Sequence, residues 1–289
     1  MTAGGAQGAD TREFQYRVRW RSQHALPGHH KSSRSGAGYE YVATAPLLDY
    51  PDPRRLDIRR SVRDPFGQLF VRLYNQHSLV PVYALADLSG SMGFQGAASK
   101  LAVLREFVSI LAFSANRTGD PFGLVACADK VLPQFVLPAT RNAEAVRVTV
   151  QRLSAYRPAG GGAQGLIEAA PLMGYRRALV FLLSDFHFPL DFMRHLLRAV
   201  ARHDVVPIVL WDSAEYQDPP TFGIARIRDS ETGVERYTWL RSALRQRLRE
   251  AFERRRKALE NLCLEFGYPP YFLLDAIDCD RINRFFLER

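Results

Sequence analysis

The sequence predicts an α/β fold in which a doubly wound, mostly parallel sheet carries helices on both faces. Uninterrupted apolar runs recur along the chain, and segments with apolar residues at helical spacing separate them. Strands that consist of continuous apolar runs are typical of parallel sheets that helices cover on both sides. We expect strands at 79–86, 122–126, 131–136, 178–183, 205–210 and 271–274, and helices at 99–116, 142–153, after 164, 190–202 and 241–257.

The part of the chain before this pattern has a different composition, which predicts three segments. Residues 1–12 are rich in glycine and alanine and are expected to form a disordered tail. Residues 13–77 are expected to form a small N-terminal β-rich extension and connector, and residues 78–289 the main domain. Within the extension, the alternation at 14–20 indicates a half-buried strand. A polar loop is expected at 27–36, a connector with internal ion pairs at 50–65 and a strand at 68–74. Near the end of the chain, 222–240 reads as a hairpin with its turn at 231–233.

Composition excludes several classes of protein. Hydrophobic residues make up 47% of the 289 positions, enough for a core without disulfides or structural metal. Cys127, Cys263 and Cys279 are scattered and lack the CxxC spacing of a zinc site. No apolar run approaches the about 18 residues that a membrane-spanning helix needs. The N-terminal residues contain no apolar signal core. We therefore expect a soluble, cytoplasmic protein.

The formal net charge of +9 comes almost entirely from arginine, since lysine occurs only at positions 31, 100, 130 and 257. The densest basic stretch, 241–257, has apolar residues at helical spacing, which predicts an amphipathic helix. Its basic face is either simply solvated or docks on an acidic partner surface. Nucleic acid is not an expected partner, because no recognition motif accompanies the charge.

One cluster of polar residues follows the expected strands directly. Asp87, Ser89 and Ser91 form an Asp-x-Ser-x-Ser motif after the run 79–86, and Asp185 and Asp212 each follow a later strand. The carboxyl ends of parallel strands form the working edge of such sheets. Carboxylates and hydroxyls at this edge suit a hard cation such as Mg²⁺ or Mn²⁺. The alternative is a turn in which the same side chains cap the backbone.

The segment 87–92 (Asp-Leu-Ser-Gly-Ser-Met) resembles the metal-ion-dependent adhesion site, or MIDAS, of von Willebrand factor A domains, and 182–186 (Leu-Leu-Ser-Asp-Phe) resembles the strand that carries their distal aspartate. Further similarity at 50–58, 61–63, 229–233 and 285–289 points to a bacterial family of such domains found beside MoxR-type AAA+ ATPases. The segments 14–20 and 27–30 are similar to the subgroup associated with maturation of methanol dehydrogenase.

This resemblance implies a non-catalytic, metal-dependent adaptor for a MoxR-type AAA+ ATPase in the maturation of a client enzyme, or in metal insertion into it. In the family's arrangement Asp87, Ser89 and Ser91 would bind Mg²⁺ or Mn²⁺, and Asp185 would bind it through water. An acidic residue of the client would fill the open coordination position. The usual threonine is missing, because Gly162 or Ala163 stands in its place. We therefore expect weak metal binding that a partner assists.

Two enzymatic alternatives have weaker support. A serine hydrolase using Ser91, Asp185 and a histidine would match hydrolase order. However, His187, His195 and His203 all lie beside or on the helix after Asp185, and none follows the last strand. A dinucleotide-binding enzyme would use the GxGxxG match at 160–165, but a helix rather than a strand is expected before it. The chain has no GxxxxGK[ST] motif and is not itself the ATPase.

Overall fold

The computed structural model describes residues 12–20, 27–94, 96–158, 161–215, 223–228, 235–240 and 242–289. For 27–40, 42, 75–78, 223–228, 235–240, 242–245 and 248 it describes the backbone only. The chain divides into two compact units. The larger contains 1–17, 81–117 and 121–289, and the smaller contains 18–80 with 118–120. Most of the expected tail at 1–12 lies outside the described residues.

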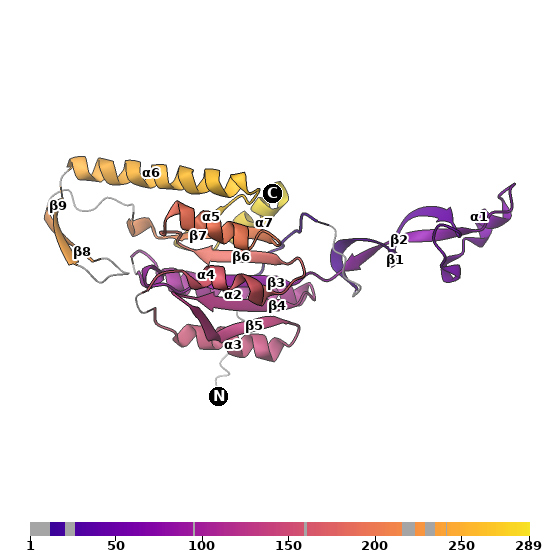
Figure 1. The fold of residues 1–289 in the computed structure, drawn as a ribbon, viewed down its shortest axis with the longest axis horizontal. Helices are drawn as coiled ribbons and strands as arrows, with labels where there is room; N and C mark the ends of the chain where they lie inside the picture. Colours follow the sequence, from indigo (N-terminus) through magenta and orange to yellow (C-terminus); the bar gives the residue numbers. More distant parts are fainter. Residues whose placement is uncertain are drawn as a thin grey trace, which may run out of the picture. The chain divides into compact units, whose positions relative to one another are not determined.

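The larger unit is built on a six-stranded sheet (Figure 1). Its strands are β3 (Val82–Asp87), β4 (Phe122–Cys127), β5 (Val131–Thr140), β6 (Leu179–Ser184), β7 (Asp204–Trp211) and β10 (Tyr271–Leu274). Their order is β10-β7-β6-β3-β4-β5. Every neighbouring pair is parallel except β4 and β5, so β5 is an antiparallel edge strand. The predicted mostly parallel sheet is confirmed, and the strands that end at Asp87, Ser184 and Trp211 are neighbours in it.

The apolar runs form strands because both of their faces are covered. Every residue of β3, β4, β6 and β7 is buried. Successive side chains of a strand point to opposite faces. On β6, Val180 and Leu182 join one apolar cluster, while Phe181 packs against the rings of Phe14 and Phe107 on the other side. The two faces of the sheet thus belong to two separate apolar layers.

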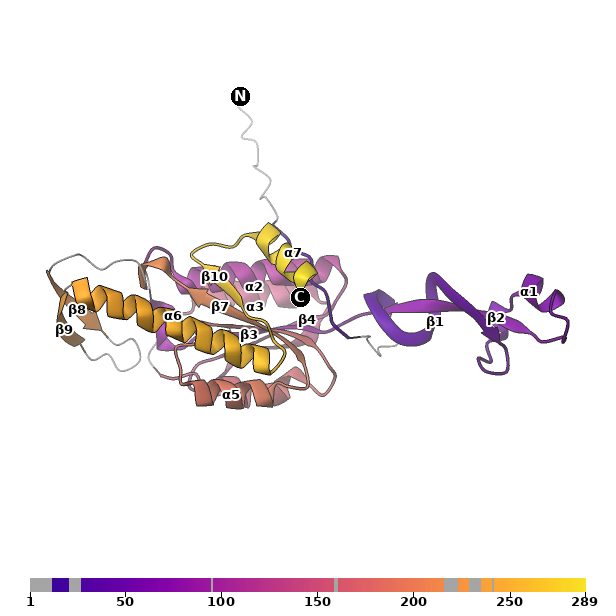
Figure 2. The same ribbon diagram turned by 90° about the horizontal axis from the view of Figure 1, so that it is seen from above.

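Helices cover both layers, as predicted. The face that includes Val180 packs against α4 (Gly165–Glu168), α5 (Leu190–Ala199) and the later turns of α6 (Ser242–Glu265). The opposite face packs against α2 (Lys100–Arg117) and α7 (Cys279–Glu288), and α3 (Ala143–Ala155) lies against α2 and β5. Figure 2 shows α2 and α7 on one side of the strands and α5 on the other. Short 3₁₀ helices follow two strand ends: η2 (Gly90–Gly93) and η4 (Ser213–Glu215).

The prediction of a strand at 14–20 is wrong, although its burial pattern is right. Phe14 and Tyr16 are buried and their neighbours are exposed, as the alternation indicated. The segment is not a strand, however, because these two rings insert into the layer around Phe181. The backbone N–H of Phe14 donates to Ser114 on α2 instead. Ring packing and a hydrogen bond to a side chain therefore hold Phe14 and Tyr16 in place, and pairing with another strand does not.

The smaller unit is an antiparallel pair of strands with a compact connection. Strand β1 (Pro27–Pro46) pairs with β2 (Phe70–Ser78), and the register shifts several times along β1. The predicted loop at 27–36 is therefore wrong, because these polar residues form part of β1. In the connection, Asp52 caps η1 (Pro53–Arg55) and Asp57 caps α1 (Ile58–Val62). An internal ion pair of the predicted kind joins Arg55 and Asp52 at 3.3 Å, and Asp57 also pairs with Arg72 on β2 at 2.9 Å.

Two further segments complete the larger unit. The predicted hairpin is confirmed as β8 (Gly223–Arg228) paired with β9 (Glu235–Leu240), although its predicted turn at 231–233 lies outside the described residues. The basic helix continues to Glu265, where Leu259, Leu262 and Cys263 are buried against the sheet. Among the described residues, no helix has the length and apolar character needed to cross a membrane.

Candidate functional site

The Asp-x-Ser-x-Ser motif forms a tight turn at the carboxyl end of β3. Asp87 is the last residue of the strand, and η2 begins three residues later. The N–H of Ser89 donates to Asp87 Oδ1 (2.9 Å), so the carboxylate caps the turn, which the alternative interpretation expected. The hydroxyl oxygens of Ser89 and Ser91 lie 3.2 Å apart, and all three side chains are buried. The turn therefore directs two hydroxyls and one carboxylate into a common buried region.

Asp185 enters the same region from the neighbouring strand. Ser184, the last residue of β6, donates its hydroxyl to Asp87 Oδ2 at 2.6 Å. The backbone then turns at Phe186, whose φ of 53° is unusual for a residue with a side chain. Three contacts hold this turn: Phe186 N–H donates to Ser184 Oγ, and Trp211 Nε1 and His187 N–H donate to Asp185. The turn places the Asp185 carboxylate near Asp87.

Asp87 is the electrostatically unfavourable group of this cluster. Its burial, and next the negative charge of Asp185, raise its pKa to about 6, although hydrogen bonds from Ser184 and Ser89 act in the opposite direction. Among the described residues, Asp87 has no cationic partner within ion-pair distance. A buried carboxylate without a counter-charge is costly. This location therefore favours a cation.

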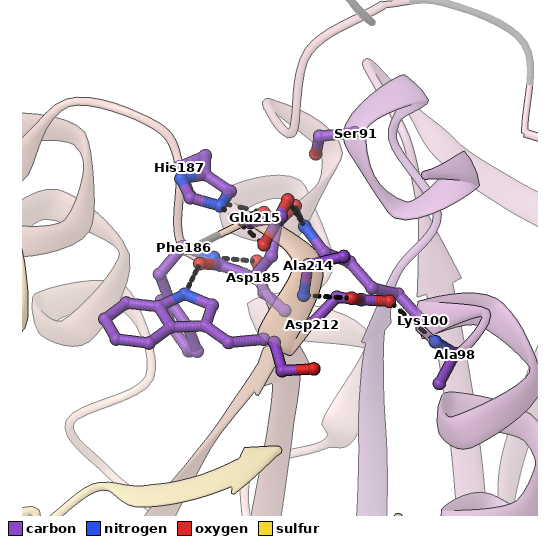
Figure 3. A network of polar contacts seen from close by, with 12 residues as sticks. Ser91, Ala98, Lys100, Asp185, Phe186, His187, Asp212, Ala214 and Glu215 are labelled. Atoms are coloured by element: carbon purple, nitrogen blue, oxygen red, sulfur yellow. Dashed lines mark hydrogen bonds and ion pairs between the residues drawn. The ribbon is translucent and has the colours of Figure 1, made fainter. Parts of the chain in front are cut away.

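A buried lysine neutralises Asp185 instead (Figure 3). Lys100, the first residue of α2, is only 2% exposed, and its Nζ lies 2.9 Å from Asp185 Oδ2 and 2.6 Å from Glu215 Oε1. Glu215 Oε2 is 3.7 Å from His187 Nε2. Burial by itself would raise the pKa of Glu215, but its contacts with His187 and with the charge of Lys100 lower it to about 2. The carboxylate of Glu215 is therefore ionised at neutral pH.

Asp212, the third aspartate that follows a strand, has a structural role. Its carboxylate accepts hydrogen bonds from the N–H groups of Ala97, Ala98 and Ala214, each at 2.8–2.9 Å. Burial raises its pKa, but these backbone donors outweigh burial and lower it overall. A side chain at Gly96 would collide with Asp212 Oδ1, at 2.6 Å from its Cβ. Asp212 thus fastens the loop before α2 to the end of β7.

At the two positions that could carry the family's threonine, 162 and 163, neither side chain can bind a cation. Ala163 is buried and has only a methyl group, and a Cβ at Gly162 would meet no atom within 4 Å. Gly165 begins α4 in close contact with the backbone of Lys130, where a Cβ would lie 2.4 Å from its carbonyl carbon. This contact fixes the loop's end, while position 162 stays open.

The donor set fits a hard divalent cation at Asp87, Ser89 and Ser91. Within the described part of the chain, no three His, Cys, Asp or Glu side chains are arranged to hold a metal ion. Any cation here would therefore depend on the two serine hydroxyls as well as on Asp87. Oxygen donors of this kind suit Mg²⁺ or Mn²⁺, which keep several bound waters.

The arrangement does not resemble a hydrolase triad. Ser91 has Ser89, not a histidine, as its hydrogen-bond partner among the described residues. His187 faces Glu215, and His203 accepts a hydrogen bond at Nδ1 from the N–H of Ala178. The segment before the glycine-rich loop is helix α3, so the strand that a dinucleotide site requires is also missing there.

Sequence reasoning missed three members of the cluster: Lys100, Ser184 and Glu215. Lys100 and Glu215 are 115 positions apart, and no spacing rule connects them. One available signal was the use of lysine at the start of an amphipathic helix, in a chain that otherwise relies on arginine. Ser184 directly precedes Asp185, and its place at the end of an apolar run could have marked it.

Comparison with known protein families matches residues 51–261 to the family described as "Protein of unknown function DUF58". The chain belongs to this family. An uncharacterized protein of Mycobacterium tuberculosis (strain ATCC 25618 / H37Rv) is 23% identical over 244 residues, which cover 82% of this chain and 75% of that protein. A Paracoccus denitrificans protein described as an "uncharacterized protein in moxR 3'region" is 32% identical over 94 residues, covering 32% of this chain and 90% of that protein.

Solved structures similar to this DUF58 protein include an aerotolerance-related membrane protein from Bacteroides fragilis NCTC 9343. It is 15% identical, with a TM-score of 0.42, over 72% of this chain and 97% of that chain. The SpRpn10 VWA domain is 14% identical, with a TM-score of 0.38, over 72% of this chain and 95% of that chain.

Proposed function

We propose that this DUF58 protein is a non-catalytic adaptor that binds an acidic partner through a divalent cation. Asp87, Ser89 and Ser91 would hold Mg²⁺ or Mn²⁺ directly, and Asp185 would bind it through water. When bound, the cation supplies a coordination position that a carboxylate of a second protein can fill. The observation that carries this proposal is Asp87, a fully buried carboxylate whose charge is opposed by burial and by Asp185.

We propose a cytoplasmic MoxR-type AAA+ ATPase as the partner and an enzyme under maturation as the client, with methanol dehydrogenase as the first client to test. Support comes from the Paracoccus denitrificans relative, which is described by its place in the moxR region. Helix α6 supports an electrostatic contact, because Arg247, Arg254 and Lys257 are exposed on it. A basic surface of this kind attracts an acidic partner.

The proposal is tested by binding between the purified protein and a MoxR-type ATPase of the same organism. We expect Mn²⁺ to strengthen the binding of wild type and EDTA to weaken it. Neither should change the binding of Asp87→Ala. The exposed variant Asp280→Ala is the matched control and should behave as wild type. Equal binding by wild type and Asp87→Ala under all conditions would show that the interaction does not depend on a cation at Asp87.

A further inference from the structure

Of the three lysines whose side chains the structure describes, at positions 100, 130 and 257, only Lys100 is buried, and it lies beside the candidate cation site. Besides its two carboxylate contacts, its Nζ lies 5.5 Å from the centre of the Phe94 ring. Burying an ammonium is unfavourable unless opposite charges compensate it. Two carboxylates and an aromatic face do so here, and together they fix the ammonium in one place.

The ammonium changes the charge that a cation would encounter. Asp87, Asp185 and Glu215 carry three negative charges against one positive charge on Lys100, a formal net charge of −2. A divalent cation would bring this group to neutrality. Without Lys100 the group would stand at −3 and would remain negative after a divalent cation had bound. His187 and Asp212 also lie at this edge of the sheet, but their charges do not change when Lys100 is removed.

We propose that Lys100 is a built-in counter-charge that weakens divalent-cation binding but makes the cation-loaded site receptive to an acidic partner. This inference rests on the cation site of the proposed function. Its two effects have one electrostatic origin: a positive charge repels the incoming cation, and it later attracts the incoming carboxylate. The site would then be filled mainly when cation and partner bind together.

Three charge states of the cluster test the first effect. The formal net charge of Asp87, Asp185, Glu215 and Lys100 is −2 in wild type. Glu215→Gln changes it to −1 and keeps Lys100 paired with Asp185. Lys100→Met changes it to −3. We expect the Mn²⁺ affinity, measured by calorimetry, to rise from Glu215→Gln through wild type to Lys100→Met, by roughly tenfold between neighbouring states. Lys257→Met removes the same charge from the exposed face of α6 and should change the affinity less than about twofold, because solvent screens it.

Lys100→Met removes the ammonium from beside the buried carboxylates of Asp185 and Glu215, which is unfavourable enough that the variant can fail to fold. The double variant Lys100→Met/Glu215→Gln restores the net charge of −2 and removes one of these carboxylates. We expect it to fold and to bind Mn²⁺ with an affinity near that of wild type. Together with Glu215→Gln, it keeps the test decisive even if the single lysine variant cannot be purified.

The second effect is measured with acetate as a simple carboxylate probe. Acetate is titrated into Mn²⁺-saturated protein, and its binding is followed through the relaxation of water protons by the bound Mn²⁺. We expect weaker acetate binding to Lys100→Met than to wild type, although that variant binds Mn²⁺ more tightly. A purely structural role of Lys100 would weaken both.

The outcomes separate this inference from the proposed function. Equal Mn²⁺ affinities across the charge series, or an order that does not follow the charge, would overturn the role of Lys100 and leave the cation site intact. No Mn²⁺ binding by any variant, Lys100→Met and the double variant included, would overturn the cation site and the inference together. Mn²⁺ binding detected only in Lys100→Met would support the inference.

Discussion

Ser184 on β6 donates its hydroxyl to Asp87 on β3, with 2.6 Å between Oγ and Oδ2. The Oγ of Ser184 also accepts a hydrogen bond from the N–H of Phe186. One small side chain therefore connects the buried carboxylate of one strand with the turn that carries Asp185. The two halves of the candidate site depend on this contact for their relative position.

Ser184→Ala should lower the free energy of unfolding by about 1–3 kcal/mol, because it leaves a buried carboxylate with one donor fewer. Urea unfolding measures this change. Ser154→Ala, which removes an exposed hydroxyl on α3, should change stability by less than about 0.5 kcal/mol. If the two variants are equally stable, the contact between Ser184 and Asp87 contributes nothing to the fold.

Protonation of His203 should destabilise the larger unit at acidic pH. Its Nδ1 accepts a hydrogen bond from Ala178, and burial, followed by the charges of Arg202 and Arg177, lowers its pKa from 6.5 to about 4. The unfolded chain therefore binds this proton at a higher pH than the folded chain. The contribution of His203 is complete above pH 6.5 and is lost as the pH falls from 6.5 to 4.

The measurement is urea unfolding of wild type and His203→Gln at a series of pH values. Between pH 7 and pH 4.5 the stability of wild type should fall by about 2 kcal/mol more than that of His203→Gln, which does not titrate in this range. Parallel curves for the two proteins would show that His203 is not the group responsible.

Much of the fold could be predicted from the sequence, because burial on both faces leaves a direct trace in it. Strand β6 is an unbroken apolar run that ends at Ser184, so its position and its depth in the sheet were readable. Strand β1 was missed because a polar run carries no such trace. At Phe14 and Tyr16 the alternation of apolar and polar residues indicated the burial correctly. It could not show whether the backbone of this segment pairs with another strand.

The candidate site was only partly readable for a related reason. Asp87, Ser89 and Ser91 are close in sequence, so their spacing indicates one place. Lys100 and Glu215 meet only because α2 and β7 converge at the same edge of the sheet. Asp212 has the same position after a strand as Asp185, and only the structure shows that backbone N–H groups occupy its carboxylate.

Some arginines of helix α6 are exposed and should bind the partner, whereas another packs inward and supports the candidate site. Arg247→Glu/Arg254→Glu reverses two exposed charges and should weaken ATPase binding about tenfold at low salt and much less at high salt. Arg141→Glu/Arg152→Glu makes the same change around α3 and is the control. Interferometry at several salt concentrations measures both. Equal, salt-independent binding of the two double variants would exclude α6 from the contact.

Arg255 on the same helix has a different environment, since its guanidinium donates to the carbonyls of Phe186 and Phe188. It therefore holds the turn with positive φ beside Asp185.

A threonine restored at the glycine-rich loop should strengthen cation binding. Gly162→Thr meets no atom at its Cβ, so it should fold as wild type and tighten Mn²⁺ binding by about threefold through its hydroxyl. Gly162→Val has the same shape without the hydroxyl and should leave the affinity unchanged. Calorimetry distinguishes the two variants, and equal affinities would show that position 162 does not face the cation.

We propose above that Asp87 holds a divalent cation and that an acidic partner completes the coordination of this cation. Calorimetric titration of Mn²⁺ into wild type and Asp87→Asn, alone and with the ATPase, tests it most directly. We expect weak binding to wild type alone, at least about fivefold tighter binding with the partner, as is typical of coupled sites, and no binding to Asp87→Asn. Mn²⁺ binding that is the same for both proteins, or absent from wild type even with the partner, would contradict the account.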